Sequence, residues 1–179
     1  MIICFTDGSS SWKRKRGGSG VYIQNGKEEI KLSFPFKNIK TGQSELTALL
    51  FCLLKLVELN KTEDQIILYS DSQYLVNELN NWSYDHVKQK FVGKKNVELL
   101  YYLLYLKIQF KDLNIFWCKG HQEVQNKIAE GNDVADKLAT SHNLLNEDEL
   151  YDFNNFLSDI QIEIKENNII EFVEENYIR

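Results

Sequence analysis

The sequence predicts an α/β fold with one five-stranded mixed sheet, in which an antiparallel meander is followed by parallel strands. Three strand-forming runs follow one another closely near the amino terminus, and helical periodicity begins only after them. Further strands then alternate with helices, and such crossover units keep their strands parallel and their helices on the faces of the sheet. We therefore expect helices on both faces of this sheet.

The meander occupies the first part of the chain. Strands are expected at residues 2–5, 20–24 and 27–36, and Asn25-Gly26 is expected to form the hairpin turn between the last two. A serine- and glycine-rich loop with the basic run Lys13-Arg14-Lys15-Arg16 connects the first two strands.

The helices follow from apolar residues at three- and four-residue spacing. The clearest stripe lies within residues 44–60 and consists of Leu46, Leu49, Leu50, Leu53, Leu54 and Val57. A second helix is expected at 72–82, a third after a cap at Asn96 and a fourth after a cap at Asn132. Buried strands are expected at 65–69 and 113–118, whereas 83–95 has no clear period and 119–131 has the composition of a polar loop.

Composition narrows the class of protein. The 179 residues suit one compact domain, no apolar run reaches the roughly 18 residues of a membrane span, and the amino terminus lacks the pattern of a secretory signal. Cys4, Cys52 and Cys118 are widely spaced and lie in apolar runs. We expect buried free thiols and a reducing compartment, cytoplasmic or nuclear, rather than secretion.

The net charge of −5 hides an uneven distribution. Residues 143–179 hold ten acidic and two basic residues, a net of −8, which leaves +3 for residues 1–142. We interpret 1–142 as the main domain and 143–179 as an acidic C-terminal extension. A stripe of Leu150, Phe153, Phe156, Leu157 and Ile160 predicts a helical extension, although Ile160, Ile162 and Ile164 also alternate as in a strand.

Four carboxylates stand at equivalent places in this predicted fold. Asp7 follows the first strand, Asp71 follows the fourth, Glu45 opens the first helix and Asp136 lies in the first turn of the last. If the first and fourth strands are parallel neighbours, their carboxyl ends place Asp7 beside Asp71. Each acid alone also fits a turn residue or a partner of the helix dipole. Together they would repel one another unless cations neutralised them, and oxygen ligands suit Mg²⁺ or Mn²⁺ rather than zinc.

Five segments resemble type 1 ribonuclease H, in that family's order. They are Phe5-Thr-Asp-Gly-Ser9, Gln43-Ser-Glu-Leu46, Tyr69-Ser-Asp-Ser-Gln-Tyr74, Lys119-Gly-His121 and Gly131-Asn-Asp-Val-Ala-Asp-Lys-Leu-Ala139. The resemblance spans residues 1–142 and implies a ribonuclease H-like catalytic domain. It implies an endonuclease that hydrolyses the RNA strand of RNA–DNA hybrids with a pair of Mg²⁺ ions, leaving 5′-phosphate and 3′-hydroxyl ends. The implied metal ligands and catalytic residues are Asp7, Glu45, Asp71 and Asp136.

The same resemblance suggests further site residues. It assigns His121 to proton transfer or product release. Contacts in the minor groove, where 2′-hydroxyls distinguish RNA from DNA, are implied for Gly8, Ser9, Thr41, Gln43 and Ser44. A basic protrusion that holds the DNA strand is implied by Trp82, Lys94 and Lys95, although a solvated charged surface would have the same composition.

Three departures from the family pattern accompany this resemblance. The residues before Glu45 lack the usual asparagine, the loop from His121 to Asp136 is longer than usual, and the basic protrusion is short. A nuclease of the same fold that acts on DNA, and a catalytically silent hybrid-binding module, are the alternatives. A monomer is expected. The extension is expected to pack on the domain, to compete with nucleic-acid phosphates or to dock a protein partner.

Overall fold

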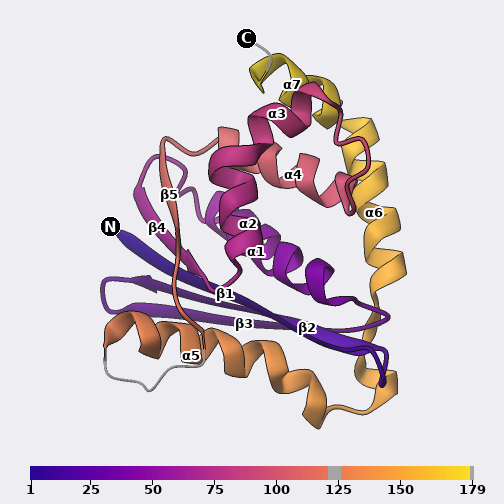
Figure 1. Cartoon of the computed structure of the whole chain (residues 1–179). Coiled ribbons are helices and arrows are strands. Elements are labelled where there is room, and N and C mark those ends of the chain that lie inside the picture. The colour runs from indigo at the N-terminus through magenta and orange to yellow at the C-terminus, as the bar shows by residue number, and fades with distance from the viewer. Residues whose placement is uncertain (121–125, 178–179) are drawn as a thin grey trace.

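The computed structural model describes residues 1–120 and 126–177 and contains one mixed sheet with the strand order β5-β4-β1-β2-β3-β6 (Figure 1). The strands are β1 (Ile2–Ser11), β2 (Arg16–Asn25), β3 (Glu28–Lys37), β4 (Gln65–Ser70), β5 (Asp112–Trp117) and β6 (Tyr151–Asp152). The first three form the predicted antiparallel meander, and β4 and β5 pair parallel to β1 and β4, respectively. The predicted mixed architecture is therefore confirmed.

The hairpin between β2 and β3 turns one residue later than expected. Asn25 pairs with Glu28, so Gly26 and Lys27 form the turn. Gly26 has φ +65°, a left-handed conformation that glycine adopts without a side-chain clash, and such a glycine suits the first central position of a two-residue hairpin.

Helices cover both faces of the sheet, as predicted (Figure 1). On one face lie α1 (Thr41–Glu58) and α4 (Val97–Ile108), and on the other lies α5 (Lys127–Thr140). The larger apolar core lies on the α1 face, and a smaller cluster of Phe5, Tyr22 and Ala135 lies beneath α5.

Helix α5 approaches the sheet closely because glycines line the contact. A Cβ atom at Gly20 of β2 would overlap the backbone of Ala135, and one at Gly131 of α5 would overlap the ring of Phe5. This close packing fixes the middle of α5, including Asp136, above β1.

The predicted start of the last helix is wrong, whereas α4 begins after Asn96 as predicted but without the expected side-chain cap bond. Helix α5 begins at Lys127, and the Asn126 side chain caps it by accepting a hydrogen bond from the Ala129 N–H at 2.8 Å. Asp136 therefore lies in the middle of α5 rather than in its first turn. Asn96 precedes α4 but has φ 58° and makes no side-chain cap bond.

The segment after β4 is helical over a longer range than its periodicity suggests. It forms α2 (Gln73–Asn77), a π-helical stretch η1 (Glu78–Trp82) and α3 (Ser83–Lys88). The single helix expected at 72–82 thus becomes two short elements, α2 and η1, and residues 83–88 form a third, although their sequence has no clear period. Short elements carry too few turns for a stripe to emerge; α3 buries only Ser83 and Val87.

The C-terminal extension is helical and packs on the domain. It contains short 3₁₀ turns, η2 (Ser141–Leu144) and η3 (Glu147–Glu149), and the helices α6 (Phe153–Glu166) and α7 (Ile169–Tyr177). Phe153, Ile160 and Ile164 are buried whereas Ile162 is exposed, which is the pattern of a helix. In Figure 1, α6 runs along the edge of the α1 layer, and α7 lies beside α3 and α4, in agreement with their contacts.

The prediction of five strands is wrong, because the extension adds a sixth. Tyr151 and Asp152 pair parallel with Phe36 and Lys37 of β3. A strand of this length is too short to leave an alternating pattern in the sequence.

The cysteines are free and buried, as predicted. Among the described residues, no helix combines the length and apolar character that crossing a membrane requires.

Candidate active site

The parallel pairing of β1 with β4 determines where the first two carboxylates lie. The last pair of this ladder is Thr6 with Ser70, so Asp7 and Asp71 are the next residues on neighbouring strands. Asp7 lies within β1 rather than after it, because β1 continues to Ser11 in its pairing with β2. The expectation that Asp7 and Asp71 emerge beside each other is confirmed.

Glu45 reaches the same region from α1. It lies in the second turn of this helix, one turn later than expected. A Cβ atom at Gly8 would lie 2.4–2.7 Å from atoms of Ser44 and Glu45, so only glycine allows β1 to run this close to α1. This contact holds Glu45 close to the end of the β1–β4 ladder.

Ser72 positions Glu45, a role that the sequence reasoning missed. Its hydroxyl accepts a hydrogen bond from the Leu75 N–H at 3.2 Å and caps α2. The same hydroxyl hydrogen-bonds the Glu45 carboxylate and lowers its pKa, whereas burial and the Asp71 charge raise it and burial has the largest effect. A serine at an N-cap is visible in a sequence, but its second partner comes from another helix.

Asp7 is the electrostatic centre of the cluster. Its side chain is 6% exposed and accepts a hydrogen bond from the Gly8 N–H at 2.9 Å. Burial first, and then Asp71 and a hydrogen bond with Asp136, raise the pKa of Asp7 to about 9. The raised pKa favours the protonated form of Asp7 when no cation is bound.

The donor set fits hard divalent cations. The carboxylates interact electrostatically in pairs, Asp7 with Asp136, Asp7 with Asp71 and Asp71 with Glu45. Within residues 1–120 and 126–177, no group of three or more His, Cys, Asp or Glu side chains is gathered tightly enough to hold a metal ion. The fit therefore rests on donor chemistry, because carboxylate oxygens are the ligands that Mg²⁺ and Mn²⁺ prefer.

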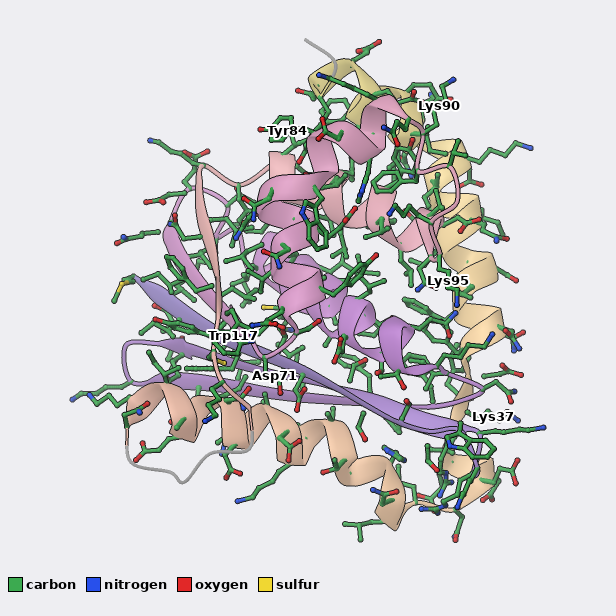
Figure 2. The ribbon with its side chains drawn as sticks, in the orientation of Figure 1. Lys37, Asp71, Tyr84, Lys90, Lys95 and Trp117 are labelled. Carbon is green, nitrogen blue, oxygen red and sulfur yellow. The ribbon has the colours of Figure 1, made fainter. Side chains whose placement is uncertain are left out.

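The β5 side of the cluster consists of backbone and aromatic groups. The Trp117 indole N–H donates to the Asp71 carbonyl oxygen at 3.1 Å, and Figure 2 shows Trp117 beside Asp71. A Cβ atom at Gly120 would lie 2.6 Å from the Asp71 carboxylate, so the chain passes directly against it. Burial and the charges of Asp71 and Asp7 raise the pKa of Cys118 to about 11, which keeps this thiol neutral. His121 lies outside the described residues.

The predicted minor-groove residues have different surroundings. Gly8 and Ser9 follow Asp7, and the Ser9 hydroxyl lies 3.3 Å from His142 Nε2. Thr41 is exposed and shares a hydrogen bond of 2.7 Å with Ser10. Gln43 uses its side-chain oxygen to accept from the Lys40 N–H at 3.0 Å.

Ser44 does not fit the predicted direct contact. Its side chain is fully buried and donates to the Thr41 carbonyl oxygen at 2.8 Å. Its hydroxyl therefore supports the start of α1 instead of facing a substrate.

The predicted protrusion is exposed and firmly anchored. Trp82, Lys94 and Lys95 are exposed, and Figure 2 places Lys95 well away from Asp71. The structure adds a buried pair at its base, in which His86 Nδ1 lies 2.7 Å from Glu78 Oε1. This pair explains His86 as a structural residue.

The fold and this carboxylate cluster define a nuclease-type α/β domain. Residues 1–143 match the family model described as RNase H. The chain is 34% identical over 142 residues to ribonuclease H of Orientia tsutsugamushi (strain Boryong), covering 76% of this chain and 79% of the relative. It is 32% identical over 140 residues to ribonuclease HI of Haemophilus ducreyi, covering 75% and 85%. The chain belongs to the ribonuclease H family of hydrolytic endoribonucleases.

Solved structures share the fold. Prototype foamy virus protease–reverse transcriptase matches with a TM-score of 0.68 and 24% identity, over 81% of this chain but only 21% of the viral chain. LC9-RNase H1, a type 1 RNase H with the type 2 active-site motif, matches with a TM-score of 0.63 and 16% identity, over 77% of this chain and 69% of that one.

Proposed function

We propose that this enzyme hydrolyses the RNA strand of RNA–DNA hybrids at the cluster of Asp7, Glu45, Asp71 and Asp136. The observation that carries the proposal is the parallel β1–β4 register, which sets Asp7 beside Asp71 at the end of the ladder, with Asp136 and Glu45 close enough to interact with them. Such an arrangement costs folding free energy unless it serves cation binding. The membership of the ribonuclease H family supports the choice of reaction.

The four carboxylates would hold a pair of divalent cations, Mg²⁺ or Mn²⁺. When bound, such a pair activates water and stabilises the charge on the scissile phosphate and the leaving 3′ oxygen, which yields a 5′ phosphate and a 3′ hydroxyl. Asp7 and Asp71 are placed by the β1–β4 ladder, and Ser72 orients Glu45. His121 takes the role of proton transfer in this proposal.

Substrate selection is assigned to two surfaces. Gly8, Ser9, Thr41 and Gln43 lie on or next to the elements that carry Asp7 and Glu45, where they can follow the minor groove and its 2′-hydroxyls. Trp82, Lys94 and Lys95 provide an exposed aromatic and basic surface for the DNA strand.

Cleavage of matched substrates tests the proposal. A hybrid labelled on either strand, duplex DNA of the same sequence and duplex RNA are each incubated with Mg²⁺. We expect cuts in the RNA strand of the hybrid, with 5′-phosphate ends. Preferred cleavage of duplex DNA would support a DNA nuclease of this fold, and binding without turnover would support a silent hybrid-binding module.

A further inference from the structure

Four basic residues surround a hollow at the far end of the β1–β2 hairpin. Arg14 and Lys15 come from the turn, Arg16 begins β2, and Lys37, which pairs with Arg16, ends β3. The opposite wall comes from the start of the extension and consists of Leu145, Asn146, Glu147 and Leu150. The hollow has a volume of about 420 Å³. Figure 2 shows Lys37 near the end of the sheet, where the hairpin meets the extension.

Among the described residues that line the hollow, the four basic side chains outnumber the acidic ones. Arg16 is only 5% exposed, and none of the ion pairs within the described part of the chain includes Arg16 or the other three basic residues. Arg14 donates to the neutral Asn143 side-chain oxygen at 2.9 Å. Within residues 1–120 and 126–177, Glu147 is the one carboxylate that lines the hollow.

The nearby His142 is affected by the charges of the two arginines. Burial lowers the pKa of His142 most, and the charges of Arg16 and Arg14 lower it further. The His142 Nδ1 atom is buried without a hydrogen-bond partner, and its Nε2 atom faces Ser9. The basic side chains of the hollow therefore lie in a partly enclosed place, where water screens their charge weakly.

We propose that this hollow binds one phosphate group of the nucleic-acid backbone. Arginine forks match phosphate oxygens in pairs, and the lysines add charge. Arg16 pairs with Ser11, four residues beyond Asp7 on β1, which at the rise of a strand corresponds to roughly 13 Å. Phosphates of one strand advance about 3.4 Å each along a duplex, so a strand cut at the carboxylates places a phosphate at the hollow within a few nucleotides.

The hollow depends on residues outside the family match. The match ends at residue 143, whereas Leu145, Asn146, Glu147 and Leu150 form one wall. The extension thus forms one wall of the proposed phosphate site in addition to packing on the domain. This inference rests on the proposed function, since it assigns the phosphate to the same hybrid.

Salt dependence of hybrid binding tests the inference, with Asp71→Asn as the background that blocks cleavage. Adding Lys15→Gln and Lys37→Gln should weaken binding about ten-fold at low salt and lower the slope of log K against log [salt] by about 1, the value for one lost phosphate contact. Lys27→Gln with Lys31→Gln is the matched control. It removes the same charge from exposed positions of the meander that do not line the hollow, and the slope should stay unchanged.

A second variant works in the opposite direction. Glu147→Gln removes the carboxylate from the hollow and should tighten hybrid binding about two- to five-fold at low salt, because repulsion of the phosphate disappears. Asp148→Asn is its control, since Asp148 is exposed on the same turn but does not line the hollow. Asp148→Asn should tighten hybrid binding clearly less than Glu147→Gln does.

Equal slopes for the hollow and control variants, or equal effects of Glu147→Gln and Asp148→Asn, would overturn the inference. Binding of inorganic phosphate that the hollow variants abolish, with an unchanged slope for the hybrid, would assign the hollow to a free anion and would also overturn it. Cleavage of the hybrid by the parent protein is measured in parallel. A parent that does not cleave defeats the proposed function, whereas normal cleavage with equal slopes defeats only this inference.

Discussion

Asp7 and Asp71 lie at the same level of two neighbouring parallel strands, because Thr6 of β1 pairs with Ser70 of β4. Burial first, and then the charge of Asp71, raise the pKa of Asp7 to about 9. Helix α1 adds Glu45 and helix α5 adds Asp136 to the same cluster. The proposed catalysis depends on the neighbouring positions of Asp7 and Asp71.

Asp71→Asn should abolish cleavage and stabilise the metal-free protein. A neutral amide cannot balance cation charge, but it removes repulsion of Asp7 and Glu45 and should increase the free energy of unfolding by about 1–2 kcal/mol. Activity assays and denaturant unfolding in EDTA measure both effects. Turnover close to that of the parent would reject Asp71 as a metal ligand.

Ser72→Ala should weaken metal use and α2 together. Loss of an N-cap costs about 1 kcal/mol of stability, and Glu45 loses the hydroxyl that orients it. We expect a higher Mg²⁺ concentration for half-maximal activity, with Ser72→Thr restoring it. If Ser72→Ala lowers stability while the Mg²⁺ requirement stays the same, Ser72 is a helix cap and nothing more.

His121→Ala should slow turnover without abolishing it, since a single proton-transfer group contributes roughly 10²–10⁴-fold. Single-turnover rates between pH 6 and pH 9 provide the measurement. Rates equal to those of the parent across this range would show that the family role of His121 does not apply to this chain.

Phe153→Ala should destabilise the whole protein. Phe153 is fully buried and packs edge-on against Phe36 of β3, so truncation should cost about 3–5 kcal/mol, or roughly 6–20 °C in Tm. Ile162→Ala on the exposed face of the same helix is the control and should change Tm little. Equal and small shifts for both variants would mean that the extension adds little to the stability of the domain.

The unfolding free energy should respond to pH through His142. Its pKa is lowered in the folded protein, so it stays neutral while the unfolded chain takes up a proton. Above pH 6.5, the ordinary pKa, both states are neutral and no difference arises; as the pH falls below 6.5, the folded state loses stability. His142→Gln should therefore lose less stability than the parent between pH 7 and pH 5, as measured by denaturant unfolding. A larger loss in the variant would show the opposite sign of linkage.

Local sequence patterns were sufficient to predict the meander and the parallel crossover strands, because each depends on a few adjacent residues. The neighbouring positions of Asp7 and Asp71 then followed from the parallel pairing of their strands. The start of α5 was missed because its first turn, Lys127-Ile128-Ala129-Glu130, mixes polar and apolar residues and buries only the small side chain of Ala129. The sixth strand, β6, has two residues and gains its pairing from β3.

Tertiary contacts decided the rest of the site. Phe91 stands among lysines in the sequence, yet it is buried against Tyr101 of α4. Ser44 resembles a substrate contact by position, but its hydroxyl is used within the start of α1. Ser72 acquires its second partner only when α1 and α2 meet. None of these partners is adjacent in the sequence, so no local pattern reveals them.

The most direct measurement is single-turnover cleavage of a hybrid with a labelled RNA strand, in Mg²⁺ and in EDTA, by the parent protein and by Asp7→Asn. We expect the parent to cut the RNA strand in Mg²⁺ and not in EDTA, and Asp7→Asn to bind the hybrid without cutting it. Cleavage by the parent in EDTA, or undiminished cleavage by a folded Asp7→Asn, would contradict the assignment of the carboxylate cluster as the catalytic site.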